Sequence, residues 1–504
     1  MSGRARHTLR PCDEQGIALV LALLILTVLA IALSSVIYFT STNERSSRYA
    51  KAQQLAATLA EAGINDAVAV LFNPQNSLDL LEPTLLPERT SSQYEGGTVT
   101  WKGVLGSDDV WTLTATGKVT NPTGPGAQPV LRTLTALVPI KGPTTKELKL
   151  PVWNFIYSAR VGNTCDMTID QSVALTSPIF VEGNLCLRST ATLMNGPVGV
   201  RGQLTLGQPQ NAVGSTSSPV GVVFVGNGCI YKNLARVWPC RPEPTARTNI
   251  WANQFSNTAL PAELSGVTLP PVDWAGWYKY GSPGPWRPCT TKAGPVPVFD
   301  NTTLDPVTGT LVPNGLNNDV AGIFDLTPST SDYTCQTRRG ELSWNHLTHT
   351  LTINGTVFID GSAKVDNGAA NVYQGQGVIY LGGTLLIKNS KLCAVLNAAK
   401  TDCDFSKWDP NSTLLVFATH AQGGQIPVGD GVQVVSSGFQ GGLYAEYAID
   451  ASTTSTTQGP LVSGTQVIVG QSNGVQFPKI TIVPVGMPGY SPDVWTAEVN
   501  SFGG

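Results

Sequence analysis

Charged residues are scarce in this chain of 504 residues, and neither sign dominates. Lysine and arginine together number 31 and aspartate and glutamate 34, so the formal net charge is −3 and charged residues make up 13% of the sequence. This balance excludes a basic nucleic-acid binder and an acidic disordered chain as overall descriptions. We therefore expect no nucleic acid among the partners.

The sequence patterns of several enzyme classes are also missing. It contains no G-x-S-x-G elbow, phosphate-binding loop, H-E-x-x-H motif or Cys-x-x-Cys pair, and its four histidines are scattered. His346 and His349 are the one close pair, and residues three apart on a strand point to opposite faces, so we interpret them as surface residues. The sequence predicts no metal site, no cofactor and no enzyme.

One apolar run, by contrast, is long enough to span a bilayer. No charged residue lies between Glu14 and Glu44, and the apolar core extends from Ile17 to about Phe39, residues 17–39. Arg4, Arg6 and Arg10 precede the run, so the positive-inside rule predicts a cytoplasmic N-terminus and an outer C-terminal part.

A helical pattern continues beyond the membrane run, with one apolar stripe and one polar face. It ends at Asn73-Pro74, because proline disfavours the helical conformation of the residue before it. We expect one helix over residues 17–73. The apolar stripe consists of Ala52, Leu55, Ala56, Leu59, Gly63, Ile64, Ala67, Val68 and Leu71.

The remaining chain is rich in glycine, proline and threonine and predicts β structure, so the fold class is α+β, mainly β. Residues 74–150 hold three segments that alternate apolar and polar residues, which predicts a small antiparallel meander packed on the helix. We place a domain border near Leu150.

Residues 151–504 repeat a short strand, a glycine and another short strand, as in "IFVEGNLCL" and "VIYLGGTLLI". Such repetition without helices favours stacked coils, a right-handed β-helix or solenoid, and a β-sandwich is the alternative. The rhythm fails at about 241–341, a Pro- and Trp-rich stretch that we interpret as an insertion.

Nine cysteines fall on the two sides of the membrane run. Cys12 precedes it, and an even number follows in what we expect to be an oxidising compartment, which predicts four disulfides. Pairing of neighbours closes the shortest loops, above all Cys229 with Cys240 and Cys393 with Cys403. The outer cysteines are Cys165, Cys186, Cys229, Cys240, Cys289, Cys335, Cys393 and Cys403.

Two groups of residues are candidates for binding or catalysis in the outer domain. Asp360 and Asp366 lie an even step apart and are candidates for an acid/base pair, although aspartate beside glycine or asparagine is more often a turn residue. Aromatic residues gather in the insertion and either stack on a sugar or protein ligand or form the core of the insertion. They are Trp274, Trp277, Tyr278, Tyr280 and Trp286.

The N-terminal features together identify a family resemblance. A basic leader, Gly16, an uncharged run that starts at once and the helical segment "AATLAEAGINDAV" resemble the class III signal of type IV pilins and pseudopilins. PilX-like minor pilins and the general-secretion K-type pseudopilins are the most similar of these. The resemblance covers roughly residues 4–72 and implies a leader, residues 1–16, that a prepilin peptidase cuts between Gly16 and Ile17. Most pilins have glutamate at the fifth mature position, where this chain has Leu21. K-type pseudopilins and many PilX-like proteins also lack this glutamate.

The resemblance implies a minor pilin or pseudopilin-like protein, made as a single-pass protein of the bacterial cytoplasmic membrane and carried to the cell surface by assembly. Its implied partners are other pilins, the pilus or secretion machinery, the prepilin peptidase and inner-membrane lipid. The outer domain would then act in filament assembly, tip placement or adhesion to a surface or carbohydrate ligand. Two alternatives stay open, a membrane-anchored β-helix polysaccharide lyase or glycosidase and an uncleaved anchor on a structural envelope protein.

Overall fold

The chain forms two compact units, and each is described here by itself. Unit 1 comprises residues 1–141 and 495–504, and unit 2 comprises residues 142–494. The sequence predicted an outer domain of 151–504, whereas the last ten residues belong to unit 1. The computed structural model describes residues 14–73, 76, 80–106, 108–124, 126–141, 146–147, 149–170, 174–232, 234–281, 290–291, 294–295, 323–337, 339–359, 361–420, 431–470, 478–490, 496–497 and 501–503.

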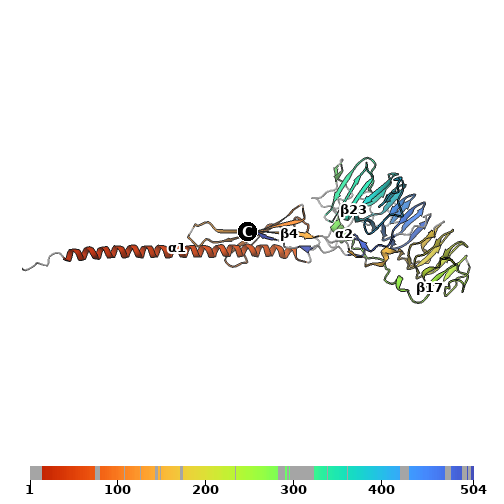
Figure 1. The fold of residues 1–504 in the computed structure, drawn as a ribbon, viewed down its shortest axis with the longest axis horizontal. Coiled ribbons are helices and arrows are strands. Elements are labelled where there is room, and N and C mark those ends of the chain that lie inside the picture. The colour runs from red at the N-terminus through yellow and green to blue at the C-terminus, as the bar shows by residue number, and fades with distance from the viewer. Residues whose placement is uncertain are drawn as a thin grey trace, which may run out of the picture. The chain divides into compact units, whose positions relative to one another are not determined.

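Unit 1 combines one long helix with an antiparallel sheet (Figure 1). Helix α1 runs from Glu14 to Leu71, close to the predicted limits. The sheet is the predicted meander, in which each strand pairs antiparallel with the next, and its strands are β1 (Arg89–Ser91), β2 (Gly97–Leu105), β3 (Val110–Val119) and β4 (Val130–Lys141). Two C-terminal strands complete it by pairing antiparallel with β4: β38 (Thr496–Ala497) and β39 (Ser501–Gly503).

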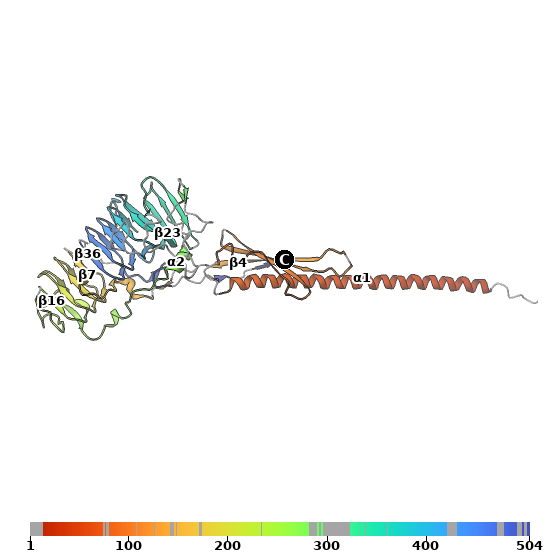
Figure 2. The ribbon, with the colours of Figure 1, turned by 180° about the vertical axis from the view of Figure 1, so that it is seen from behind.

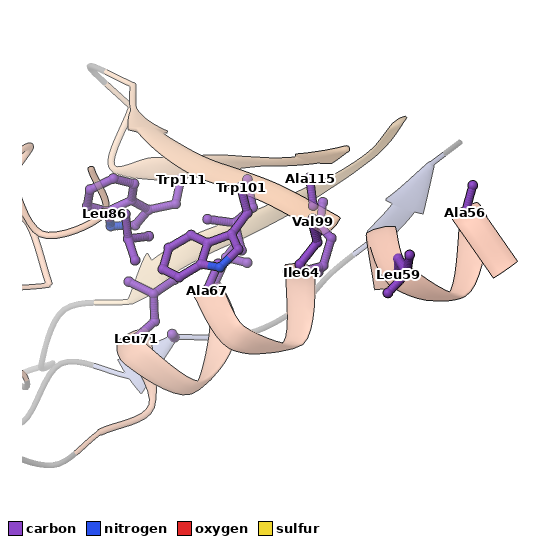
Figure 3. Close-up of a cluster of buried hydrophobic side chains, with 14 of the residues drawn as sticks. Ala56, Leu59, Ile64, Ala67, Leu71, Leu86, Val99, Trp101, Trp111 and Ala115 are labelled. Atoms are coloured by element: carbon purple, nitrogen blue, oxygen red, sulfur yellow. The ribbon is translucent and has the colours of Figure 1, made fainter. Parts of the chain in front are cut away.

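The sheet packs against the second half of α1 through a stripe of small side chains. Ala52, Ala56, Ala60 and Ala67 are buried on one face of the helix, and Gly63 lies among them. A side chain at Gly63 would bring its Cβ within 2.5 Å of Val99. Figure 3 shows the larger residues that fill the space beside this stripe: Leu59, Ile64 and Leu71 of α1, and Leu86, Val99, Trp101 and Trp111. Helix and sheet therefore approach closely because small residues leave room.

Unit 2 is a stack of coils in which strands of successive coils pair in parallel (Figure 2). One ladder contains, in spatial order, β23 (Thr350–Ile359), β26 (Gln376–Leu381), β29 (Leu414–Thr419), β32 (Gly442–Ala445), β35 (Leu461–Ser463), β6 (Ile156–Ser158), β9 (Ile179–Val181), β12 (Val198–Val200), β15 (Val220–Val225) and β17 (Ala252–Ser256).

A second ladder contains β20 (Ile323–Asp325), β24 (Ser362–Val365), β27 (Leu385–Lys388), β30 (Val432–Val435), β33 (Ile449–Thr453), β36 (Val467–Gly470), β7 (Cys165–Asp170), β10 (Asn184–Leu187), β13 (Leu204–Leu206) and β16 (Cys229–Tyr231). Shorter strands form a third side, namely β25 (Ala370–Gln374), β28 (Lys391–Cys393), β31 (Gly438–Gln440) and β34 (Thr456–Gln458) in one half of the stack, and β8 (Ala174–Leu175), β11 (Thr192–Leu193) and β14 (Ala212–Val213) in the other. This parallel stacking is what the strand-glycine-strand rhythm predicted, and an antiparallel sandwich does not have it.

The order of strands in the stack differs from their order along the chain. The last strands, β35 and β36, pair with the first, β6 and β7, so that Leu461 lies beside Ile156 and Val467 beside Met167. The chain thus enters and leaves unit 2 in the middle of the stack. One half runs from β6 to β17 and the other from β20 to β36, and residues 257–322 connect the two outer ends of the stack.

One outer end is covered by antiparallel strands. Strand β22 (Gly340–Asn345) pairs with the N-terminal part of β23, and β21 (Tyr333–Gln336) pairs with β22. Because β22 pairs with β23, this part of β23 is not an open edge of the stack. Unpaired edge strands promote association with other chains, and the cap reduces that risk.

Candidate functional site

The first half of α1 is apolar and exposed along its whole length. Its most apolar window has a mean hydropathy of 3.0 and is 0% buried, and in the part of the chain that the structure describes α1 is the one helix long and apolar enough to cross a membrane. Hydroxyl groups within the run donate to helix carbonyls, as Thr27 does to Leu23 at 2.8 Å and Thr40 to Val36 at 2.7 Å. A hydroxyl with such a partner costs little in lipid or in a bundle of helices.

The predicted processing and packing residues lie at the start of this helix. Gly16 is in the first turn of α1, Ile17 is 66% exposed and Leu21, one turn further on, is 58% exposed. No carboxylate of the described chain lies between Glu14 and Glu44 to pair with an ammonium group at Ile17. Cleavage between Gly16 and Ile17 stays a prediction.

The second half of α1 is fixed to the sheet by polar as well as apolar contacts. The Tyr94 hydroxyl donates to both carboxylate oxygens of Asp66, each at 2.9 Å. The hydrogen bond to Asp66 raises the pKa of Tyr94, with a further contribution from burial. Trp111, wholly buried, donates from its indole nitrogen to the carbonyl of Leu80 at 2.6 Å. The Tyr94–Asp66 bond thus fixes the second half of α1, and the Trp111–Leu80 bond fixes the segment that follows the helix.

Comparison with known proteins bears on this same helix. Residues 15–65 match the family model described as PilX N-terminal. No curated protein and no solved structure matches the chain. The match covers most of α1, so the N-terminal region of the chain is similar to the N-terminal region of PilX-like pilins.

The predicted aromatic cluster lies in the segment that connects the two halves of unit 2. Helix α2 (Trp274–Gly281) packs on β23 and β26. Trp277 is wholly buried and stacks on Tyr380 with ring centroids 5.3 Å apart, and Tyr278 meets the edge of Phe358 at 5.2 Å. Trp274, 8% exposed, lies 5.4 Å from Tyr380. Trp286 and, for its side chain, Tyr280 lie outside the described residues. The three described rings form a core between α2 and the stack, and ligand binding by them stays a prediction.

The rings that α2 covers belong to an aromatic row that sequence reasoning missed. Six of the nine strands from β23 to β15 in the first ladder place an aromatic residue at one register position, and β29, β35 and β12 place Ala418, Val462 and Gly199 there. The aromatic residues are Phe358, Tyr380, Tyr444, Tyr157, Phe180 and Phe224. The connecting segment follows this row, since the Tyr444 hydroxyl donates to the carbonyl of Pro270 at 3.0 Å. Burial raises the pKa of Tyr157 to about 12. The row is thus a packing surface for the protein's own chain.

A histidine-glutamate pair borders this covered row. The Nδ1 atom of His420 lies 2.6 Å from Oε2 of Glu446, and the indole nitrogen of Trp274 donates to the other oxygen of that carboxylate. The rings of Trp274 and His420 are 4.5 Å apart. One carboxylate therefore accepts from both rings and anchors the start of α2, and no sequence pattern had indicated the pair because its members lie 26 residues apart.

Three of the four predicted pairs of neighbouring cysteines are described, and all three form disulfides. Disulfides join Cys165 to Cys186, Cys229 to Cys240 and Cys393 to Cys403. Cys335 is disulfide-bonded as well, and its predicted partner, Cys289, lies outside the described residues. Each of the three described bridges closes a loop of one coil or less, so it secures a local connection of the stack.

Of the candidate catalytic and metal-binding residues, the structure describes Asp366 and the two histidines of the close pair. Asp360 lies outside the described residues, and Asp366 is exposed in the turn before β25. The Nδ1 atom of His346 is hydrogen-bonded to Oδ1 of Asp332 at 2.7 Å. His349 instead lies beside the ring of Trp344. Over the described residues no group of three or more His, Cys, Asp or Glu side chains is placed to hold a metal ion.

Proposed function

We propose that this protein is a minor subunit of a type IV pilus or of a related pseudopilus. In this proposal the exposed apolar half of α1 resides in the membrane before assembly and packs among the helices of other subunits afterwards. The observation that supports it most directly is the division of one helix into two halves, one without any covering and one fitted to its own sheet. An apolar surface of that length requires lipid or other helices around it.

Maturation is the first step of the proposed pathway. A prepilin peptidase cuts the peptide bond between Gly16 and Ile17 and leaves a mature chain that begins with the apolar run and lacks Cys12. N-terminal sequencing of protein recovered from cells should start at Ile17. Gly16→Val should leave the uncut chain in the membrane, and Gly3→Val, a matched change within the leader, should leave processing intact. A mature N-terminus elsewhere, or normal cutting of Gly16→Val, contradicts the proposal.

Leu21 suggests where in a filament such a subunit resides. In a bundle of helices with little water, an unpaired charge costs several kcal/mol. With Leu21 the subunit offers no carboxylate to a neighbour's N-terminal ammonium, whereas its own ammonium can pair with the glutamate of a major pilin. This favours a position with few neighbours, and a unit 2 of about 350 residues is also hard to repeat along a shaft.

We therefore infer that the protein occupies a filament tip in low copy and displays unit 2 for assembly or adhesion, without catalysing a reaction. Immunogold labelling should mark filament ends, and purified mature protein should not polymerise alone. Leu21→Glu should insert normally, because the acid finds its partner only after assembly. Even labelling along filaments, or homopolymers, would contradict tip placement while leaving the processing result unaffected.

A further inference from the structure

The loop closed by Cys229 and Cys240 includes β16 and lies at the outer end of the stack, where Figures 1 and 2 show β17 and β16. Cys229 and Val237 exchange two backbone hydrogen bonds of 3.0 and 2.8 Å, and the amide of Leu234 donates to the carbonyl of Tyr231 at 3.1 Å. The amide of Lys232 donates to Leu206 of β13 at 2.8 Å. A disulfide, a tight turn and a bond to the stack thus hold the loop in place.

This loop exposes three apolar side chains to solvent. Leu234 is 64% exposed, Trp238 57% and Val237 39%. Among the described residues of unit 2, six large hydrophobic side chains are exposed, and these three lie within five consecutive positions. Single exposed apolar residues are ordinary, whereas a group of them on one rigid loop indicates an interaction surface.

Positive charge surrounds the exposed group. Residues 182–263 contain six Lys or Arg and three acids, a net charge of +3, so the rest of the chain has −6 to reach the total of −3. Within this stretch Arg201 pairs with Glu182 at 2.7 Å. Lys232, Arg236 and Arg241 are exposed in the loop or directly after it, and the guanidinium of Arg236 lies 5.6 Å from the centre of the Trp238 ring. The carboxylate of Glu243 accepts from the amides of Thr248 and Asn249 at 3.0 and 3.2 Å and faces its own turn.

We propose that the Cys229–Cys240 loop is a contact site for an anionic lipid bilayer, into whose interface Leu234, Val237 and Trp238 insert while the cations pair with lipid headgroups. Tryptophan with an apolar body and a polar nitrogen is suited to the bilayer interface, and basic residues near an anionic surface add attraction. An acidic polysaccharide satisfies the cations and the indole face but gives no partner to Leu234, the most exposed of the three. An anionic lipid bilayer offers partners to both the cations and the exposed apolar side chains.

The test uses the full chain with α1 held in nanodiscs of phosphatidylcholine, so that the membrane helix is already covered. Binding of these discs to immobilised vesicles is measured with phosphatidylcholine plus phosphatidylglycerol and with phosphatidylcholine alone. We expect binding to the anionic vesicles, at least tenfold weaker binding after Leu234→Ser with Trp238→Ser, and several-fold weaker binding after Lys232→Gln with Arg236→Gln. Added salt should weaken the wild type, because exposed charges are screened.

Control variants distinguish this surface from general stickiness. Leu347→Ser alters a leucine that is 79% exposed in another turn, and Lys400→Gln alters an exposed lysine outside the cationic stretch; both should bind as the wild type does. Quenching by brominated lipid should be lost in Trp238→Phe and retained in the Leu347 control. Binding equal to neutral and anionic vesicles, unchanged binding in the Leu234/Trp238 variant, or preference for polygalacturonate over vesicles would each overturn the proposal.

Discussion

Replacing Gly117 with alanine tests the close packing of α1 on its sheet. A Cβ at position 117 would lie 2.0 Å from the carbonyl oxygen of Ala56, 2.9 Å from the amide nitrogen of Ala60 and 2.9 Å from Cβ of Leu59. Two of these atoms are backbone of α1, so the new methyl group cannot be accommodated by a rotamer change. Helix and strand must separate, and the overpacking should cost about 1–3 kcal/mol in the free energy of unfolding of unit 1.

A second glycine of unit 1, Gly124, serves as the control, because alanine there should raise stability and not lower it. Gly124 has nothing within 4 Å of its added Cβ, so Gly124→Ala should stabilise by about 0.4–1 kcal/mol through a less flexible unfolded chain. Native-state hydrogen exchange of β3 amides in the full-length protein in detergent reports on unit 1 alone. Protection should fall in Gly117→Ala and hold or rise in Gly124→Ala. Equal protection in the two variants would refute the argument that the small residues set the helix-sheet distance.

Further predictions concern unit 2. Trp277→Ala should lower the free energy of unfolding of unit 2, measured by denaturant titration, by about 3–5 kcal/mol, because a large buried ring is lost. Burial raises the pKa of Tyr157 to about 12 from about 10 in the unfolded chain. The stability that this difference contributes is therefore complete below pH 10 and is lost as the pH rises toward 12. In Tyr157→Phe, alkaline unfolding monitored by tyrosinate absorbance should move to higher pH. Thiol labelling of mature, denatured protein without reductant should modify none of the outer cysteines, and a stable labelled pair would contradict four disulfides.

The sequence was sufficient wherever a pattern was local. The uncharged run and the stripe of α1, the alternation of β2 to β4 and the neighbouring cysteine pairs all depend on residues close together in the chain. Gly16 and the apolar run were also what made the N-terminal resemblance specific. Periodicity and loop closure express such local constraints directly.

Pairings between distant segments were beyond the reach of these patterns. Nothing in the strand sequences says that β35 pairs with β6, some 300 residues away, because any coil of the repeat offers a similar edge to its neighbour. The same holds for β39 on β4, which moved the C-terminus from the outer domain to unit 1. The His420–Glu446 pair and the aromatic row likewise exist only once the register of the coils is fixed.

The entry of the chain at the middle of the stack has a consequence for the order in which the protein is made. As the chain is synthesised from its N-terminus, strands β6 to β17 become available first, yet β6 and β7 gain their second neighbours only when β35 and β36 have been made. Until residue 470 has been synthesised, the early half has an open edge, which can pair with another chain. A truncated product that stops short of β35 would therefore be a chain with two unpaired edges, at β6 and β7, rather than a shorter version of the same protein.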